Sequence, residues 1–293
     1  MRILLTGAGG QVGSEVRKRL RDVELLTPLR AEFDLAQPAQ LRAVLDALRP
    51  DFIINAGAYT AVDRAEDEPE LAMTVNGDAV AAIADYCRAA GAPLIQLSTD
   101  YVFDGAKPNP YVTDDAAAPA GAYGRSKLAG EAAARTVREH IVLRISWVFA
   151  AHGGNFVKTM LKLAQTRPEL GVVADQHGGP TWAGHVAEAL AMLVAQRRQR
   201  GALPAGTYHF CGGPAVSWHA FAEAIFAEAV AQGALPRAPL VRPIPSTAYP
   251  TKARRPANSV LDMASTTARL GLAQPAWRDG LRETVAALAA GEG

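Results

Sequence analysis

The sequence predicts a doubly wound α/β fold, in which helices cover both faces of a parallel sheet. Its first half alternates short apolar runs with longer amphipathic stretches, and continuous apolar runs are typical of strands buried on both faces. The alternation of strand and helix indicates parallel crossover connections. With 293 residues, of which 49% are hydrophobic, the chain is long enough to bury a sizeable core.

The expected elements follow from these runs. Strands are expected at 2–6, 23–28, 51–56, 93–98 and 141–146, and helices at 11–21, 38–48, 69–90 and 123–139. Further helices are expected near 154–166, 184–199, 217–232 and 279–290. After Trp147 loops rich in proline and glycine interrupt the rhythm, and the six prolines of 234–258 keep that segment extended or looped. We expect 1–147 to form one domain and 148–293 a smaller α/β region, interleaved with the last strands of the sheet.

Charge and composition exclude several classes of protein. The 30 basic and 29 acidic side chains leave a net charge of +1, which gives no electrostatic reason to expect nucleic acid or a membrane as a partner. The cysteines, Cys87 and Cys211, lie in apolar surroundings and are expected to be reduced. No apolar run approaches the roughly 18 residues of a membrane helix, and no signal peptide precedes the first strand. We therefore expect a soluble protein of the cytoplasm.

A glycine-rich turn follows the first expected strand. The stretch "TGAGGQVG" places Gly7, Gly10 and Gly13 in a G-x-x-G-x-x-G spacing. A tight turn here requires a positive φ, and a backbone without Cβ atoms lets a pyrophosphate approach the N-terminus of the next helix. Because a strand precedes the motif and a helix follows it, a Rossmann-like dinucleotide site is favoured over an ordinary strand–helix turn. The 1–147 domain is thus expected to bind the dinucleotide, and 148–293 mainly the substrate.

The choice between NADPH and NADH depends on the residues after the second strand. Arg30 is the first charged residue there, and its guanidinium suits a 2′-phosphate, which favours NADPH. Asp34 lies 21 residues beyond Gly13, about where NADH enzymes place a ribose-binding acid. Since the strand is expected to end by residue 28, we place Asp34 near the adenine with Leu35. Use of NADH stays open.

Small residues follow the third strand. Ala56, Gly57 and Ala58 would give the cofactor a wall without bulk at the carboxyl edge of the sheet. A close contact between helix and sheet would require the same small residues and is the alternative.

Two distant stretches form a candidate catalytic set. Tyr123 and Lys127 are four residues apart at the start of an expected helix, so they share one face. Such a pair alone usually marks an ordinary helix face, but Ser98, Thr99 and Asp100 end the fourth strand, at the edge where a nicotinamide would lie. A nearby ammonium favours the phenolate, which makes a tyrosine useful in proton transfer. The set predicts hydride transfer to a ketone.

The chain resembles the extended short-chain dehydrogenases/reductases and, more narrowly, the dTDP-4-dehydrorhamnose reductase family. The resemblance is carried by "ILLTGAGGQVG", "IINAGAYTAVDRAE", "VNGDA", "LSTDYVFDG", "YGRSKLAGE", "LRISWVF", "NFVKTML", "VVADQHGGPT" and "RRPANSVLD". These motifs span the chain from residue 3 to about 262 in order. The resemblance implies reduction of the C4 ketone of a nucleotide sugar, dTDP-4-dehydro-β-L-rhamnose, by NADPH or NADH.

The resemblance also implies roles for individual residues. Tyr123, Lys127 and Thr99 match the catalytic set, with the first two also at the cofactor. The other matches are Gly7, Gly10, Gln11, Val12 and Gly13 for the pyrophosphate turn, Ala58, Tyr59 and Thr60 for the cofactor wall, and Asp100 and Trp147 for the substrate. Asn155 and Thr181 are further candidate substrate contacts, although Asn155 is equally suited to cap a helix. Gly57 replaces a usual alanine, and Tyr59 leaves the choice of cofactor open.

Metal and phosphate contacts are weaker expectations. Some family members hold Mg²⁺ between glutamates at a dimer contact, and Glu15, Glu292 and Glu188 fall at suggestive positions, so Mg²⁺ and a homodimer are possible. Ordinary exposed helix glutamates are the alternative. The histidines show no metal-binding spacing with cysteines or acids. The basic residues 252, 254 and 255 are expected in a solvated loop rather than on the substrate diphosphate.

Two other functions stay open. A non-catalytic, NADP-binding regulatory subunit of the methionine adenosyltransferase type shares this fold, although the intact Thr99, Tyr123 and Lys127 argue against it. A sibling reductase or epimerase acting on another nucleotide sugar would differ in substrate only.

Overall fold

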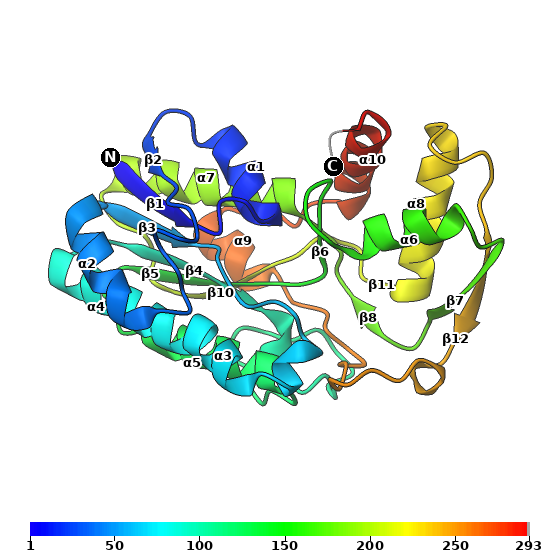
Figure 1. Cartoon of the computed structure of the whole chain (residues 1–293), viewed down its shortest axis with the longest axis horizontal. Coiled ribbons are helices and arrows are strands. Elements are labelled where there is room, and N and C mark those ends of the chain that lie inside the picture. The colour runs from blue at the N-terminus through cyan, green and yellow to red at the C-terminus, as the bar shows by residue number, and fades with distance from the viewer. Residues whose placement is uncertain (292–293) are drawn as a thin grey trace.

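A six-stranded sheet forms the centre of the structure, a computed structural model that describes residues 1–291 (Figure 1). Its order is β10-β5-β4-β3-β1-β2, and every pairing in it is parallel. The strands are β1 (Arg2–Thr6), β2 (Glu24–Leu26), β3 (Phe52–Asn55), β4 (Leu94–Thr99), β5 (His140–Ile145) and β10 (Gly206–Phe210). The order reverses between β1 and β3, so a ligand crevice is expected beyond their carboxyl ends.

Helices cover both faces of this sheet, which confirms the predicted doubly wound fold. One face carries α2 (Pro38–Leu48), α4 (Ala79–Ala90) and α5 (Ala122–Ala134), with the short α3 (Pro69–Met73) beside α5. The other face carries α1 (Gln11–Arg19), α7 (Ala183–Arg200) and α9 (Ala264–Leu270). Alternate residues of a strand point to opposite faces, so Leu4 packs toward α2 and α4 while Ile3 and Leu5 pack toward α1 and α7.

The helix expected at 69–90 is not a single α-helix. A π-helical turn, η2 (Thr74–Asp78), separates α3 from α4. Such turns are rare and occur often at functional sites. The other limits follow local chemistry: Pro38 begins α2, where its missing N–H costs nothing, and Gly91 ends α4 with a φ of 68°.

A second, smaller core lies at the right of Figure 1. It is built from β6 (Val148–Phe149), α6 (Phe156–Ala164), β7 (Glu169–Val173), β8 (His177–Gly178), β9 (Thr181–Trp182), β11 (Val216–Ser217), α8 (Trp218–Ala231), β12 (Leu240–Ile244) and α10 (Trp277–Ala289). Large aromatic side chains, including Phe149, Phe221 and Trp277, fill it. The same half of the chain also returns α7, β10 and α9 to the main sheet, so the two regions are interleaved in sequence.

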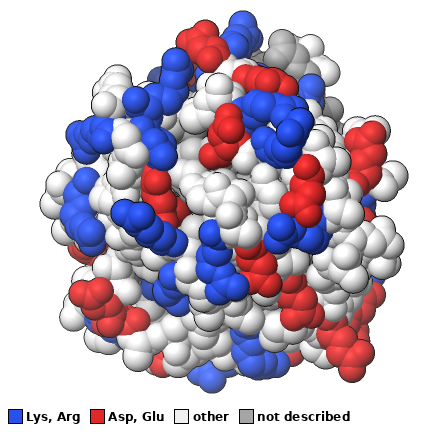
Figure 2. Space-filling view, turned by 90° about the vertical axis from the view of Figure 1, so that its left-hand side faces the viewer, with Lys and Arg blue, Asp and Glu red and all other residues white. Residues whose placement is uncertain are grey.

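The surface in Figure 2 mixes both signs of charge. Lys and Arg side chains are interspersed with Asp and Glu side chains on this face. This face therefore offers no extended basic surface of the kind that binds nucleic acid. Among residues 1–291, none of the helices combines the length and the apolar character needed to cross a membrane.

Candidate active site

The glycine turn brings the end of β1 against the end of β3. Gly7 has a φ of 64°, and a Cβ atom there would lie 2.7 Å from the Cα of Gly57. A Cβ on Gly13 would lie 2.1 Å from the carbonyl oxygen of Gly7. Gly10 is the N-cap of α1 and brings no side chain to its first N–H groups. The turn thus fits the pyrophosphate of a dinucleotide, which these N–H groups and the helix dipole would bind.

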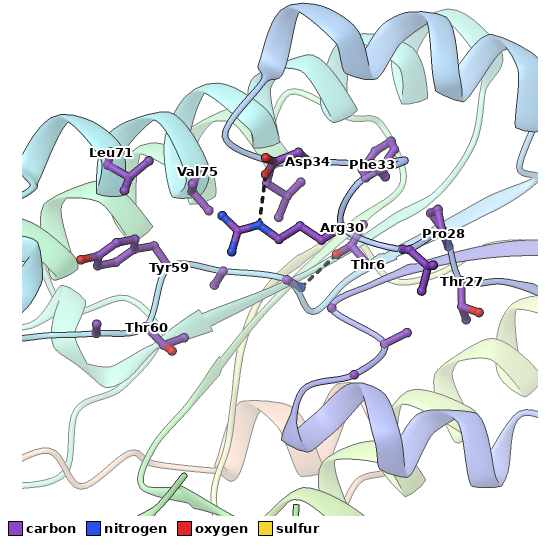
Figure 3. Close-up of a pocket in the computed structure, with 18 of the residues that line it drawn as sticks. Thr6, Thr27, Pro28, Arg30, Phe33, Asp34, Tyr59, Thr60, Leu71 and Val75 are labelled. Carbon is purple, nitrogen blue, oxygen red and sulfur yellow. Dashed lines mark hydrogen bonds and ion pairs between the residues drawn. The ribbon is translucent and has the colours of Figure 1, made fainter. Parts of the chain in front are cut away.

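A cavity of about 750 Å³ opens at the carboxyl ends of β1, β2 and β3 (Figure 3). Seven predicted cofactor residues line it: Gly7, Arg30, Asp34, Leu35, Ala58, Tyr59 and Thr60. Other lining residues were not predicted from the sequence, among them Arg17, Leu29, Phe33, Arg64, Glu68 and Leu71. Arg17 could have been found, because it lies one helical turn beyond Gly13 on α1.

Arg30 and Asp34, the rival cofactor determinants, lie in the same cavity. Their side chains form an ion pair with 3.5 Å between Arg30 Nε and Asp34 Oδ1 (Figure 3). The Arg30 side chain is 83% exposed, so it is free to turn toward a ligand. With Arg17 and Arg64, three guanidinium groups line the cavity, against the two carboxylates of Asp34 and Glu68. This balance suits an anionic group.

The remaining predicted cofactor residues support the turn. Val12 packs its side chain into the main core. The Gln11 side-chain oxygen accepts a hydrogen bond from the Asn155 amide at 3.0 Å, which ties the turn to α6. Ala56 packs against the same core as Val12.

Thr99, Tyr123 and Lys127 come together below the end of β4. Thr99 is the last residue of β4, and Tyr123 and Lys127 lie on the first turns of α5. Burial raises the pKa of Tyr123 well above its usual value, and the adjacent Thr99 hydroxyl opposes the shift. Burial lowers the pKa of Lys127 to about 8, against the attraction of Glu131. The Lys127 ammonium donates a hydrogen bond of 2.7 Å to the Leu97 carbonyl, which holds it beneath the sheet edge.

A glutamate fixes the start of the catalytic helix. The N-cap of α5 is Gly121, which has no capping side chain. Glu66 takes this role from another part of the chain, because its Oε1 accepts a hydrogen bond of 2.7 Å from the Ala122 N–H. Tyr123 is the next residue, so Glu66 helps to set its position.

An asparagine in the π-helical turn links the cofactor wall to the catalytic helix. Asn76 accepts from the Tyr59 N–H at 2.9 Å and donates to the Tyr59 carbonyl at 3.0 Å. It also donates to the Ser126 hydroxyl at 3.0 Å, and Ser126 donates to the Tyr123 carbonyl at 2.8 Å. The sequence analysis assigned no role to Asn76, Ser126 or Glu66, although "VNGDA" and "DRAE" contain two of them.

Ser98 does not join the catalytic set. Its hydroxyl donates a hydrogen bond of 2.6 Å to Glu131 Oε1. Ser98 therefore points to the side of β4 opposite to Thr99. Glu131 is fully buried and pairs with Arg144 through contacts of 2.9 and 2.8 Å. Ser98 therefore belongs to a buried ionic network between α5, β4 and β5.

Asp100 is a buried carboxylate beside Thr99. Its Oδ1 accepts a hydrogen bond of 2.9 Å from the Thr99 hydroxyl, while its Oδ2 has no hydrogen-bond partner among the described residues. Burial raises the pKa of Asp100 from 3.8 to about 6, and the Thr99 hydrogen bond opposes the shift. This rise in pKa corresponds to about 3 kcal/mol less stability at neutral pH than at low pH, where the carboxyl is protonated. A buried carboxylate with one oxygen left without a partner is typical of a functional site.

This cost gives a pH-dependent prediction. The folded state holds a proton on Asp100 up to about pH 6 and the unfolded state only to 3.8, so the stability from this group falls as pH rises through 6. We compare the free energy of unfolding of Asp100→Asn with that of the wild type. The difference should shift in favour of the variant by about 1 kcal/mol as the pH rises from about 5 to about 8. Urea unfolding of both proteins at the two pH values measures this difference, since the contributions of all other titratable groups are the same in both proteins. A difference independent of pH would contradict the assignment.

Trp147 adopts a strained backbone at the predicted substrate side. Its φ is 47°, which is uncommon for a bulky residue. The indole stacks on Trp218 with 3.4 Å between the ring centroids, and its N–H donates a hydrogen bond of 3.0 Å to the Ser259 hydroxyl. Strain of this kind is common at ligand sites.

The last two predicted substrate residues have structural partners. Asn155 caps α6 by accepting from the Lys158 N–H at 3.1 Å. Thr181 is buried, and its hydroxyl donates to the Gly179 carbonyl and accepts from the Gly212 N–H. Thr181 therefore holds the loop around it, and its hydroxyl is not free for a ligand.

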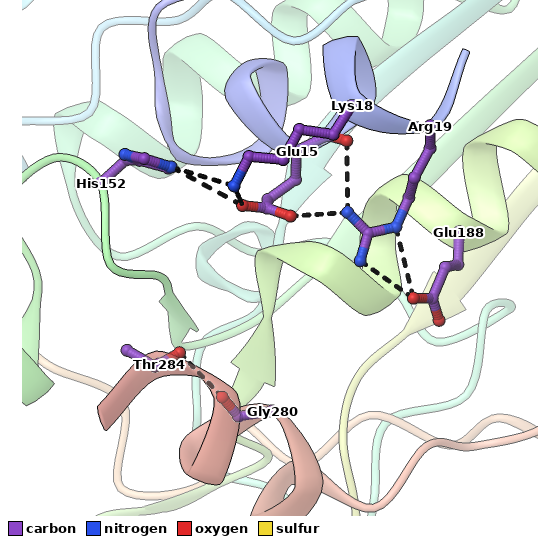
Figure 4. Close-up of polar contacts among 7 residues, drawn as sticks. All are labelled: Glu15, Lys18, Arg19, His152, Glu188, Gly280 and Thr284. Carbon is purple, nitrogen blue, oxygen red and sulfur yellow. Dashed lines mark hydrogen bonds and ion pairs between the residues drawn. The ribbon is translucent and has the colours of Figure 1, made fainter. Parts of the chain in front are cut away.

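Glu15, a predicted Mg²⁺ ligand, is bound by basic side chains (Figure 4). Its oxygens accept from Lys18 Nζ at 2.8 Å and Arg19 Nη1 at 2.6 Å, and Arg19 also pairs with Glu188 at 3.0 Å. These contacts lower the pKa of Glu15, although burial acts against them. Within residues 1–291 no group of three or more metal-ligating side chains occurs, and Glu292 lies outside the described residues.

Comparison with known proteins identifies the family of this chain. The family model described as RmlD substrate binding domain matches residues 1–290. A dTDP-4-dehydrorhamnose reductase from Burkholderia thailandensis is 46% identical over 285 residues, covering 95% of this chain and 96% of its own.

Solved structures give the same result. The NADP complex of the Bacillus anthracis dTDP-4-dehydrorhamnose reductase superposes with a TM-score of 0.88 at 32% identity, covering 97% of this chain and 98% of its own. The Clostridium acetobutylicum ortholog superposes with a TM-score of 0.90 at 32% identity, covering 98% of this chain and 99% of its own. The chain therefore belongs to the RmlD substrate binding domain family, in which these relatives are named dTDP-4-dehydrorhamnose reductases.

Proposed function

We propose that this protein reduces the C4 ketone of dTDP-4-dehydro-β-L-rhamnose to the alcohol of dTDP-L-rhamnose, with NADPH as the preferred reductant. The observation that carries the proposal is the set of Thr99, Tyr123 and Lys127, in which Tyr123 packs in one cluster with Tyr59 of the cavity wall. The 46% identity to a named reductase supports the substrate. The reaction is the last step of dTDP-rhamnose biosynthesis, and we infer that it takes place in the cytoplasm.

The residues divide the chemistry between them. NADPH, when bound, supplies the hydride that adds to C4. Tyr123 donates its phenolic proton to the developing alkoxide, and the Thr99 hydroxyl hydrogen-bonds the same oxygen. The raised pKa of the buried Tyr123 keeps it protonated, as an acid for ketone reduction must be. Lys127 is one helical turn away, and its ammonium stabilises the phenolate that remains.

The substrate is expected on the side of the second core. We assign Trp147 to one wall of the sugar pocket, with Asp100 as a polar contact. The strained backbone of Trp147 and the unpaired oxygen of Asp100 support this assignment. Asn155 and Thr181 are left out, because their polar side-chain atoms are already bonded within the protein.

The preference for NADPH rests on Arg30 and Arg17. Both line the cavity, and the exposed Arg30 side chain is free to leave Asp34 and meet a 2′-phosphate. A charge-assisted hydrogen bond to a 2′-phosphate is expected to favour NADPH by about tenfold in kcat/KM. NADH remains a slower reductant.

A coupled assay tests the function. The purified protein is mixed with dTDP-4-dehydrorhamnose made in place by the preceding enzymes, and cofactor oxidation is followed with NADPH and with NADH. We expect dTDP-L-rhamnose as the product, identified by chromatography. Turnover of only another nucleotide sugar would indicate a sibling enzyme. Stoichiometric recovery of a partner enzyme without any turnover would indicate a regulatory subunit. Light scattering of the same sample tests the homodimer that the resemblance implies.

A further inference from the structure

Residues 59–68 form a short charged segment between β3 and α3. It contains the 3₁₀ helix η1 (Arg64–Glu66), and side chains four residues apart on a helical turn lie on the same side. The charged side chains of "DRAEDE" (63–68) make contacts in three directions. Each direction meets a different part of the site.

The first side faces the cofactor cavity. Tyr59, Arg64 and Glu68 all line the cavity. Glu68 joins the other two, because its Oε1 accepts from Arg64 Nη2 at 2.6 Å and its Oε2 accepts from the Tyr59 hydroxyl at 2.7 Å.

The second side faces residues 251–258, which come from the second half of the chain. Asp63 accepts from the Ala253 N–H at 3.0 Å and also pairs with the Arg255 guanidinium. Asp67 pairs with Lys252. The Arg255 side chain was expected to be solvated, but it is paired with Asp63 and only 25% exposed.

Arg255 connects this contact to the catalytic residues. Its Nη1 donates 2.9 Å to the Tyr101 hydroxyl, and its guanidinium lies 5.9 Å from the centroid of the Tyr101 ring. The Tyr101 ring in turn packs edge-on against Tyr123, with 5.6 Å between centroids. A few residues further on, Ser259 accepts from the Trp147 indole. The 251–258 segment and the Ser259 that follows it thus border both the Tyr123 side and the Trp147 side of the proposed substrate site.

The third side faces the catalytic helix. Glu66 binds the Ala122 N–H, one residue before Tyr123. The same ten residues therefore contact the cofactor cavity, the substrate-side segment and the helix that carries the proton donor.

We propose that residues 59–68 couple dinucleotide binding to nucleotide-sugar binding, with Asp63 as the positioning residue. A dinucleotide in the cavity orders Tyr59, Arg64 and Glu68, and the shared 3₁₀ turn then holds Asp63 and, through it, Arg255. The nucleotide sugar consequently binds to a 251–258 segment whose ordering is already complete. Such coupling is reciprocal, so each ligand strengthens the other by the same factor. The inference rests on the proposed function.

Calorimetric titration of the full-length protein tests the coupling. The Kd of dTDP is measured without NADP⁺ and with saturating NADP⁺, and the ratio is the coupling factor. For the wild type we expect a factor of about 10, within the usual range of site-to-site coupling. For Asp63→Asn and Arg255→Lys we expect a coupling factor of about 1 to 2, because asparagine lacks the charge of Asp63 and lysine lacks the planar fork of arginine. The Kd of NADP⁺ measured without dTDP should be unchanged in both variants.

Asp67→Asn is the matched control. It removes the other ion pair to the same segment, but Asp67 and Lys252 are both more than half exposed and neither contacts Tyr101. Exposed pairs contribute little, so its coupling factor should stay at the wild-type value.

The possible results separate the two proposals. The coupling is overturned if the wild-type coupling factor is near 1. It is also overturned if Asp63→Asn and Arg255→Lys keep the wild-type factor. Neither result affects the proposed reductase function. A loss of affinity for both ligands at an unchanged factor would show that Asp63 is merely structural, which also overturns it. A protein that binds NADP⁺ but not dTDP would refute the proposed substrate, and the coupling with it.

Discussion

Replacing Tyr123 by phenylalanine is expected to lower kcat for ketone reduction by about 10²- to 10⁴-fold, the usual contribution of a general acid. The change removes one oxygen from a buried ring and leaves the packing against Tyr101 in place. Because Tyr123 is also a predicted cofactor contact, affinity for NADP⁺ should fall, but by far less than kcat. Steady-state kinetics with NADPH, together with calorimetric titration of NADP⁺, measures both quantities.

A second tyrosine gives the control. Tyr86 is buried on α4, far from the site, and its hydroxyl donates to the Pro50 carbonyl at 3.3 Å. Tyr86→Phe also removes one buried hydroxyl, so it should cost some stability but no turnover. Normal turnover in Tyr123→Phe, or an equal loss in both variants, would exclude Tyr123 as the proton donor.

Gly13→Ala is expected to weaken NADP⁺ binding by at least about tenfold and to destabilise the fold by about 1–3 kcal/mol. The new Cβ would lie 2.1 Å from the Gly7 carbonyl oxygen and 2.7 Å from the Ala8 Cα, and both are backbone atoms that cannot turn aside. The start of α1 must then move away from β1, and its N–H groups lose their position for the pyrophosphate. Titration of NADP⁺ and thermal unfolding measure the two effects.

Gly9→Ala is the matched control in the same turn. A Cβ on Gly9 would meet no heavy atom within 4 Å. Its stability should stay within about 0.5 kcal/mol of the wild type, as for an ordinary surface change. Because Gly9 also lines the cavity, the two variants are compared in stability alone, and equal losses of stability would mean that the close approach at Gly13 does not hold the cofactor turn in place.

Much of the fold could be predicted because its signals are local. The strand at 2–6 was predicted to the residue, as was the helix at 38–48, because an apolar run bounded by glycine or proline defines each one. The glycine turn and the Tyr123–Lys127 pair were also visible, since both are short spacings within one element. The helix expected at 69–90 was wrong in its middle, because a π-helical turn leaves no mark on apolar periodicity.

The candidate site was less predictable, since its geometry depends on contacts between distant segments. Ser98 and Thr99 are neighbours with similar hydroxyls, and only the position of Glu131 on α5 shows which face each one serves. Thr181 looked free to meet a ligand until its buried partners were visible.

The sequence alone determined the parallel sheet, the glycine turn, the spacing of Tyr123 and Lys127 that we propose to be catalytic, and the family resemblance, because each depends on residues close together in the chain. Only the tertiary structure decided where charges are paired. Asp34 meets Arg30 and Asp63 meets Arg255, and in the second pair 192 residues separate the partners. An ion pair depends on distance in space, which the order of residues does not record, so the coupling of the two binding sites could be inferred only after folding brought residues 59–68 and 251–258 together.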